Sequence, residues 1–225
     1  MTMTSKELEN EVMRLRKEVA DYARVEDYIE IWKLMSIYTH LYHRLRNAEI
    51  PALVFAQKTP GVSMEVSDGG VYEGPEGVKR FFEMYLVNTK KPGAIALHEA
   101  VNPVIEINKD GTRAKGLFHS PGLGYRRFDE KLTAIWWYGK YNVEFVKEDG
   151  KWKFWRFHIY RLLSNNFDQP FSDYEADAKA GLSFPPELRP DGPAVDDYPY
   201  RRSELVNFKP DPPEPFETFD LKNIY

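Results

Sequence analysis

Apolar residues recur at helical spacing near the start of the chain. Along residues 8–22 they stand 4, 3, 4 and 3 positions apart, with glutamate, lysine and arginine between them, at Leu8, Val12, Leu15, Val19 and Tyr22. This is the heptad pattern of an amphipathic helix. It lasts only about two heptads, which is too short for a coiled coil that stands alone. We expect this helix to pack on its own domain, and the alternative is a helix that helps to pair subunits.

A second helix is expected from about Val25 to Arg46, apolar over so much of its surface that it should be largely buried. Residues 62–66 then alternate as a strand, and Ser67-Asp68-Gly69-Gly70 forms the turn of a hairpin that returns through 71–73. The next helix begins at Gly74-Pro75-Glu76, with proline in its first turn.

Four long strands should follow. We predict them at 96–107, at 112–120 and in a hairpin from Thr133 to Leu163 that turns at Lys-Glu-Asp-Gly, with Pro121-Gly122-Leu123-Gly124 closing the second strand. The element order predicts an α+β fold, in which a strongly curved antiparallel sheet wraps around helices as a cone-shaped α+β barrel. Such a cone has an interior where a pocket can form.

The last strand combines aromatic with charged residues. Simple alternation places Arg161 on one face, together with Lys153, Trp155, Phe157 and Ile159, and places Arg156 and His158 on the other, with Trp152, Phe154 and Tyr160. If Arg161 faces the interior, then Arg156 and His158 face the convex side, where the aromatic surface suggests a subunit interface. A β-bulge would reverse this assignment.

The amino-acid composition changes after Asn166. Ten of the 16 prolines lie between Pro170 and Pro215, and only a short helix near 172–180 is expected there. Seven aromatic residues argue against a purely disordered tail: Phe184, Tyr198, Tyr200, Phe208, Phe216, Phe219 and Tyr225. We therefore divide the chain into an N-terminal helix (1–24), an α+β barrel domain (25–165) and a proline-rich arm (166–225) laid over its own subunit or a neighbour.

Composition narrows the function classes. The 225 residues carry a net charge of -4 without a block of lysine and arginine, which argues against nucleic acid as a partner. There is no cysteine, so disulfides, thiolate zinc sites and cysteine nucleophiles are excluded. No signal region or membrane span is recognisable, and we expect a cytoplasmic protein.

Three stretches resemble the SnoaL-like group of the nuclear transport factor 2-like superfamily: Ile37-Tyr38-Thr39-His40-Leu41-Tyr42-His43, Gly70-Val71-Tyr72-Glu73-Gly74-Pro75-Glu76-Gly77-Val78-Lys79-Arg80-Phe81-Phe82, and Glu148-Asp149-Gly150-Lys151-Trp152-Lys153-Phe154. The resemblance covers about residues 20–165 and implies the cone-shaped fold. The superfamily includes dehydratases, isomerases, cyclases, small subunits of ring dioxygenases and non-enzymatic binders, so the fold alone does not give the function.

The nearest pattern is that of scytalone dehydratase and bile-acid 7α-dehydratase. The resemblance implies that Tyr38 matches their pocket tyrosine, that His98 matches their strand histidine and that Arg161 matches an arginine of the final strand. The position of their aspartate, five residues after Tyr38, is His43. A histidine cannot supply the fixed negative charge that an aspartate gives to a histidine base, so the family mechanism does not transfer whole.

Other side chains complete the expected site. His98, His43 and Tyr38 are the catalytic candidates, because histidine titrates near operating pH and a tyrosine can donate a hydrogen bond to a substrate oxygen. The expected substrate-binding residues are Arg161, His119, Tyr42 and Asn102. His40 and His43 are three apart on one helix, but no spacing copies a known metal motif. We expect neither a metal nor a cofactor.

These expectations combine into a cofactor-independent dehydratase that acts on a hydrophobic cyclic or aromatic small molecule with His98 as general base. The resemblance implies a homo-oligomer, with a trimer favoured over a dimer. An isomerase would share the first half-reaction. The rival class is a non-catalytic binding or assembly protein, and a third reading is the small subunit of a ring dioxygenase. Convergence of His98, His43 and Tyr38 in one pocket would favour the enzyme, and a pocket filled by aromatic side chains would favour the binder.

Overall fold

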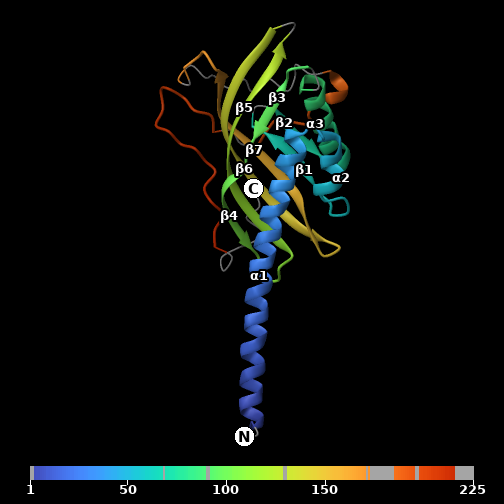
Figure 1. The fold of residues 1–225 in the computed structure, drawn as a ribbon, viewed down its shortest axis with the longest axis vertical. Coiled ribbons are helices and arrows are strands. Elements are labelled where there is room, and N and C mark those ends of the chain that lie inside the picture. Colours follow the sequence, from blue (N-terminus) through green and yellow to red (C-terminus); the bar gives the residue numbers. More distant parts are fainter. Residues whose placement is uncertain are drawn as a thin grey trace.

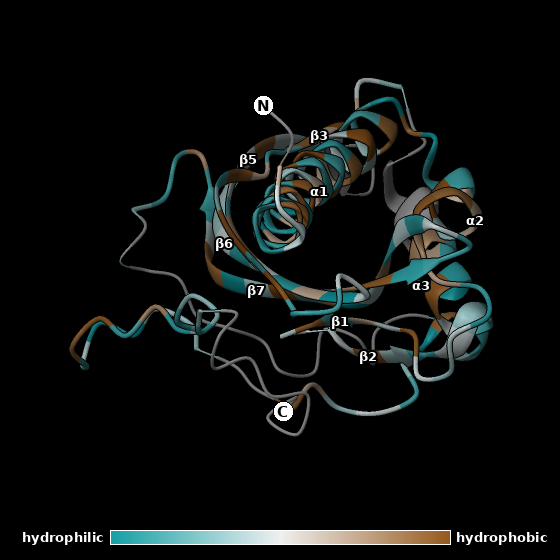
Figure 2. Cartoon of the chain, turned by 90° about the horizontal axis from the view of Figure 1, so that it is seen from below, coloured by the Kyte–Doolittle hydropathy of each residue, from teal (hydrophilic) through white to brown (hydrophobic). Residues whose placement is uncertain are grey.

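The computed structural model describes residues 3–67, 69–89, 92–128, 131–170, 172, 185–195 and 198–215. It confirms the α+β class, with a curved, unclosed sheet around a long helix (Figures 1 and 2). The described elements are α1 (Ser5–His43), η1 (Asn47–Glu49), α2 (Ile50–Val54), β1 (Ser63–Val66), β2 (Gly70–Glu73), α3 (Gly74–Thr89), β3 (Ile95–His98), β4 (Val101–Ile107), β5 (Arg113–Phe128), β6 (Lys131–Glu148), β7 (Lys151–Asn166) and η4 (Pro186–Leu188). The helix expected near 172–180 lies, apart from Ser172, outside the described residues, as do Phe184, Phe216, Phe219 and Tyr225.

The two expected N-terminal helices form one continuous helix, α1. A capping box starts it, since the Thr4 side chain accepts the N–H of Glu7 while the Glu7 carboxylate accepts the N–H of Thr4. The first half of α1 projects from the body (Figure 1). The expectation that this part packs on its own domain is wrong, because Leu8 is 55% exposed and Tyr22 75% exposed.

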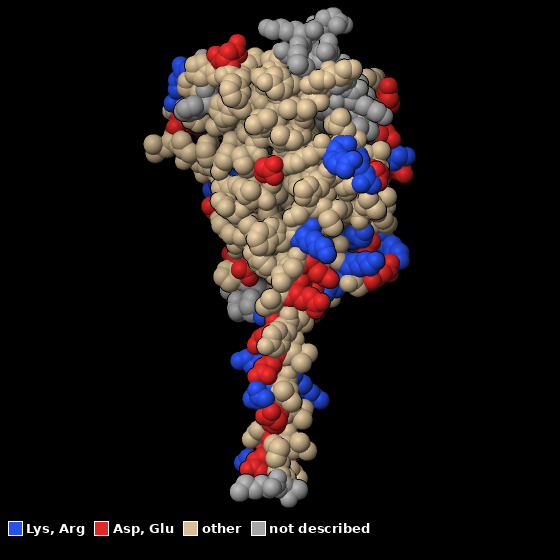
Figure 3. Space-filling model, in the orientation of Figure 1, with Lys and Arg blue, Asp and Glu red and all other residues tan. Residues whose placement is uncertain are grey.

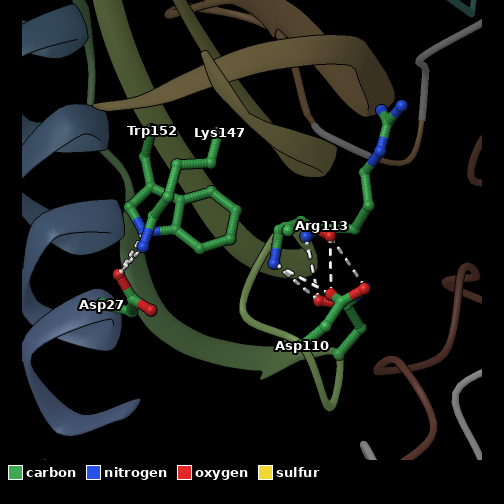
Figure 4. Close-up of polar contacts among 7 residues, drawn as sticks. Asp27, Asp110, Arg113, Lys147 and Trp152 are labelled. Atoms are coloured by element: carbon green, nitrogen blue, oxygen red, sulfur yellow. Dashed lines mark hydrogen bonds and ion pairs between the residues drawn. The ribbon is translucent and has the colours of Figure 1, made fainter. Parts of the chain in front are cut away.

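Asp27 fixes α1 to the sheet at the point where the helix leaves the body. Its Oδ1 accepts hydrogen bonds from Lys147 Nζ at 2.5 Å and from Trp152 Nε1 at 2.8 Å (Figure 4). The β4–β5 turn lies nearby in the same view, where Asp110 Oδ1 accepts the hydroxyl and the N–H of Thr112. Beyond Asp27, α1 buries Ile31, Leu34, Met35, Tyr38, Thr39, Leu41 and Tyr42 in the concave side of the sheet.

The strand order is β2-β1-β7-β6-β5-β3, and β4 also pairs with β5. The predicted β1–β2 and β6–β7 hairpins are both present, and the second turns at Asp149 and Gly150, which have positive φ. The pairing is antiparallel except that β1 runs parallel to β7. The expected strand at 96–107 is divided into β3 and β4, which pair with different parts of β5.

The expected turn at Pro121–Gly124 is wrong, because β5 continues through it to Phe128. The two glycines permit close approach instead of a turn. A Cβ on Gly122 would lie 1.8 Å from Trp137 Nε1, and a Cβ on Gly124 would lie 2.5 Å from the carbonyl oxygen of Ile95. Glycine at these positions lets Trp137 lie across β5 and lets β3 pair with it.

A bulge in β7 corrects the predicted alternation. Phe154 pairs with Phe145 and Arg156 pairs with Glu144, so Trp155 is an extra residue in the ladder. Phe154 and Phe157, three apart, therefore both contact the Tyr38 ring on the concave side, at 5.8 and 5.0 Å between centroids. Arg156 and His158 lie on the convex side as expected.

Parts of the C-terminal arm pack on β2 and on the convex side of their own subunit (Figure 2), whereas residues 201–207 are exposed. The Tyr198 ring stacks on Tyr160 at 5.8 Å, and Lys140 Nζ donates to the carbonyl oxygens of Phe208 and Pro210. Earlier in the arm, Asp191 donates its N–H to the carbonyl oxygen of Val71 in β2, and its Oδ2 accepts the N–H of Glu73. Its carboxylate also forms an ion pair with Arg80 at 2.6 Å. Part of the convex surface expected to pair subunits is thus covered by the chain itself.

Candidate functional site

A cavity lies on the concave side of the sheet, between α1, α3 and strands β3, β5, β6 and β7. Its lining combines aromatic residues with a few polar ones: Tyr38, Tyr42, Phe81, His98, Ser120, Trp137, Tyr138, Gly139, Tyr141, Ile159, Tyr160 and Arg161. The free volume at its centre is about 20 Å³, which is room for one water molecule. Four of the seven sequence-predicted site residues line it, namely His98, Tyr38, Tyr42 and Arg161.

His98 reaches this cavity because of its register in the sheet. It pairs with Gly122, which pairs in turn with Trp137, so the three residues stand side by side on the concave face. Its imidazole stacks on Trp137 at 4.1 Å between centroids and meets the edge of Tyr42 at 5.1 Å. Since Gly122 has no side chain, the indole ring fits over β5 beneath the imidazole.

Tyr38 reaches the cavity from α1, and Arg161 reaches it from β7. Tyr38 is 2% exposed and lies among Tyr42, Phe82, Tyr141, Phe154 and Phe157. Arg161 comes from β7, opposite Gly139 of β6. A phenol and a guanidinium at one cavity can both donate hydrogen bonds to an oxygen atom.

Ser120 is a polar residue of the cavity that sequence reasoning missed. It is 2% exposed, and its Oγ has no hydrogen-bond partner among the described residues. A buried hydroxyl without a partner costs free energy unless water or a ligand satisfies it. Strand alternation contains the signal, because choosing between His119 and Ser120 amounts to choosing a face of β5.

His43 differs from its expected place, since it is not among the residues that line the cavity. Its Nε2 lies 3.0 Å from the backbone nitrogen of His98 and 3.0 Å from the carbonyl oxygen of the same residue. The Glu99 carboxylate is 4.0 Å away. His43 therefore links α1 to the end of β3 and holds His98 in position, whereas the aspartate pattern implied a group inside the pocket.

His119 and Asn102 also lie outside the cavity. His119 pairs with Lys140 on the convex face, where its Nδ1 is 2.5 Å from the Tyr138 hydroxyl. Burial, followed by the charge of Lys140, lowers the pKa of His119. Asn102 is exposed, with φ 52° in the irregular pairing between Val101 and Val104. The bulge turns its side chain away from the interior.

The described residues contain no group of three or more histidine, aspartate or glutamate side chains placed to hold a metal ion. His40 is exposed, and its ring centroid lies 6.5 Å from that of His43. Within the described ranges, no helix combines the length and the apolar character that a membrane crossing needs.

Known proteins resemble the chain in fold. The model of the SnoaL-like domain matches residues 23–158. A candidate scytalone dehydratase from Novosphingobium aromaticivorans DSM 12444 is 19% identical, with a TM-score of 0.53 over 66% of this chain and 92% of that one. The hexachlorocyclohexane dehydrochlorinase LinA-type3 from Novosphingobium barchaimii LL02 is 18% identical, with a TM-score of 0.53 over 67% and 96%.

A candidate aromatic ring hydroxylase from Novosphingobium aromaticivorans is 20% identical, with a TM-score of 0.54 over 63% of this chain and 94% of that one. No curated protein matches the chain. At these identities the solved structures show the fold alone, and the matched domain model extends over more than half of the sequence. The chain therefore belongs to the SnoaL-like family.

Proposed function

We propose that this protein is a cofactor-independent lyase, a dehydratase that acts on a hydrophobic cyclic or aromatic small molecule. The observation that carries the proposal is an imidazole, that of His98, in an aromatic cavity beside the buried Ser120 hydroxyl, which has no partner within the described chain. A concave, largely apolar site with a few convergent polar groups is typical of small-molecule binding. The dehydratase and dehydrochlorinase among the proteins of similar fold agree with a lyase.

In this proposal His98 removes a proton from the carbon next to a carbonyl or phenol group. Tyr38 and Arg161 donate hydrogen bonds to the oxygen on which negative charge develops. The His98 imidazolium then returns the proton to the departing hydroxyl group, so the substrate loses one water and no cofactor is consumed. His43 would act on the reaction by positioning His98, through its contacts with the His98 backbone.

The size of the cavity sets a condition on this reaction. A substrate ring needs far more than the about 20 Å³ that is free, so the lining side chains must move apart when it binds. The same observation favours a second candidate function, a non-catalytic protein whose cone is filled by its own aromatic residues. An isomerase would use the same proton abstraction without loss of water.

The two functions predict different behaviour with a panel of cyclic β-hydroxy ketones and hydroxylated aromatic compounds. A dehydratase forms a product 18 mass units lighter, detected by mass spectrometry as about one water lost per turnover. His98→Ala should lower the rate at least about 100-fold, the usual contribution of a general base. His40→Ala is the matched control, since His40 is exposed on α1.

Full activity of His98→Ala, with an unchanged melting temperature, would show that the mechanism is wrong. A product of unchanged mass would identify an isomerase. Binding of a panel compound without turnover, with an affinity that the cavity variants Ser120→Ala and Arg161→Ala both lower, would support the non-catalytic function.

A further inference from the structure

The projecting part of α1 presents an apolar face that its own subunit does not cover. We define the heptad stripe as Leu8, Val12, Leu15, Val19 and Tyr22, whose side chains are 39–75% exposed. Charged side chains occupy positions between them, as the projecting helix in Figure 3 shows. A helix with an apolar face in water is stabilised mainly by packing that face against something else.

The helix positions that follow Tyr22 at the same spacing lie along the outer side of the body. They are Glu26, Ile29, Lys33, Ser36 and His40, of which only Ile29 is apolar and none is buried. The residues of α1 that pack on the sheet, such as Ile31, Leu34 and Tyr38, lie on the other side of the helix. A partner helix can therefore follow the stripe towards the body without meeting the sheet.

We propose that the heptad stripe binds a second copy of this chain as a parallel, two-stranded coiled coil. In heptad positions, Val12 and Val19 occupy a, while Leu8, Leu15 and Tyr22 occupy d. β-Branched residues at a with leucine at d favour two strands over three or four. The resulting assembly is a dimer, which differs from the trimer that the family resemblance implies.

The flanking charges select the parallel orientation. Glu11 is at position g and Arg16, five residues later, is at position e, so in a parallel pair each Glu11 faces Arg16 of the second copy. An antiparallel pair would bring g positions together, and both Glu11 and Glu18 are acidic. Glu11 also contacts Arg14 of its own helix at 2.6 Å. These exposed pairs set the orientation of the helices and add little to the affinity.

The first experiment measures the mass of the full chain by sedimentation from about 1 to 100 µM. The wild type should approach twice its monomer mass of 26.3 kDa. Leu15→Glu removes two leucines from each dimer interface and should raise the dissociation constant about 100-fold or more. Met13→Glu is the matched control, because Met13 is 61% exposed on the same helix at position b and should leave the dimer intact.

The second experiment tests orientation and register, for which the absence of cysteine is an advantage. Leu15→Cys should give a disulfide-linked dimer on mild oxidation, because identical d positions face each other only in a parallel, in-register pair, and a disulfide needs Cα atoms within about 7 Å. Met13→Cys should stay monomeric on the same gel.

Each alternative outcome overturns the proposal. A monomer at every concentration would leave the heptad stripe to a partner of another kind, and a trimer would overturn the two-stranded assignment. Equal cross-linking through positions 13 and 15 would show that the contact is not specific to the stripe. Equal weakening of the dimer by Leu15→Glu and Met13→Glu would show the same.

Discussion

At the scale of single residues, the five histidines lie in five different environments, and the environment of each determines which role it can have. His98 is stacked in the cavity, His43 contacts the His98 backbone, and His40 is exposed. His119 bonds Tyr138, and His158 is buried beside Glu65, with 3.4 Å between Nδ1 and Oε2. Only the first has its ring at the cavity, which is why His98 is the proposed base.

His158 predicts a pH dependence of stability. Burial lowers its pKa from the ordinary value of 6.5 to about 3, outweighing the nearby Glu65 carboxylate. Between those values the unfolded chain binds the proton and the folded chain does not. The stability contributed by the neutral form is therefore complete above pH 6.5 and is lost as the pH falls towards 3.

Urea unfolding at pH 7 and pH 5 measures this effect. From pH 7 to pH 5, the free energy of unfolding should fall by about 2 kcal/mol more in the wild type than in His158→Gln. His40→Gln, on the exposed face of α1, should keep the wild-type slope. An identical pH dependence in the wild type and His158→Gln would contradict the assignment.

In β7, the sequence predicted correctly on which face of the sheet some residues lie and misplaced others, because the strand contains a bulge at Trp155. Arg161 and His158 were assigned correctly to opposite faces, because they lie on the same side of the Trp155 bulge. Trp152 and Phe154 precede the bulge, so strict alternation misplaced them. No residue type marks a bulge in advance, because pairing partners decide where the extra residue is accommodated.

At the scale of elements, glycine explains the main error in the strand assignment. Pro121-Gly122-Leu123-Gly124 has the composition of a turn, but tertiary contacts use its glycines within β5. The helix α3, both hairpins and the α+β class followed from periodicity and turn chemistry, and the family followed from the resemblance of three stretches. The continuity of α1 did not, because a buried pattern and an exposed pattern meet near residue 25 without a break in helical propensity.

Gly122→Ala tests the close approach that builds the cavity. The new Cβ would lie 1.8 Å from Trp137 Nε1 and 2.5 Å from the carbonyl oxygen of Leu97, so either the indole or β3 must shift. We expect a loss of about 1–3 kcal/mol in the free energy of unfolding. We also expect changed Trp fluorescence, because a shift of either the indole or β3 alters the stacking of Trp137 on His98.

Gly192→Ala is the matched control for that substitution. Its Cβ would meet Val71 Cγ1 at 3.5 Å, an ordinary contact, so stability should change little. If both variants were equally stable, the cavity would tolerate rearrangement near Trp137, and the requirement for glycine at position 122 would be rejected.

At the scale of the whole molecule, the two ends of the chain differ in how they contact the body. The start of α1 leaves it, whereas the described arm returns across β2 and the convex face (Figures 1 and 2). The arm buries groups that would otherwise face water, since the Tyr72 hydroxyl donates to the carbonyl oxygen of Leu188 and Glu65 accepts the N–H of Val195. The arm therefore belongs to the folded unit.

Asp191 joins the arm to the body through both its backbone and its side chain. A substitution at this position therefore tests how the arm is attached. Its Oδ2 accepts the N–H of Glu73 at 2.8 Å, and its Oδ1 pairs with Arg80 at 2.6 Å. Asp191→Ala removes both contacts and leaves Arg80 partly buried. We expect a loss of about 1–3 kcal/mol in the free energy of unfolding.

Hydrogen exchange of the backbone amides shows which part of the chain loses stability in Asp191→Ala. Backbone amides of residues 186–195 should exchange about tenfold faster in Asp191→Ala, because the segment opens before the sheet does. The exchange rates of the amides of β6 and β7 should be unchanged in the native state.

Glu214→Ala is the control for lost charge, because Glu214 is an exposed acidic residue further along the arm, and this variant should exchange as the wild type does in both regions. If exchange in 186–195 did not change, the contacts of Asp191 would not be what holds the arm, and its attachment would have to come from the backbone pairing with Val71 and the aromatic packing alone.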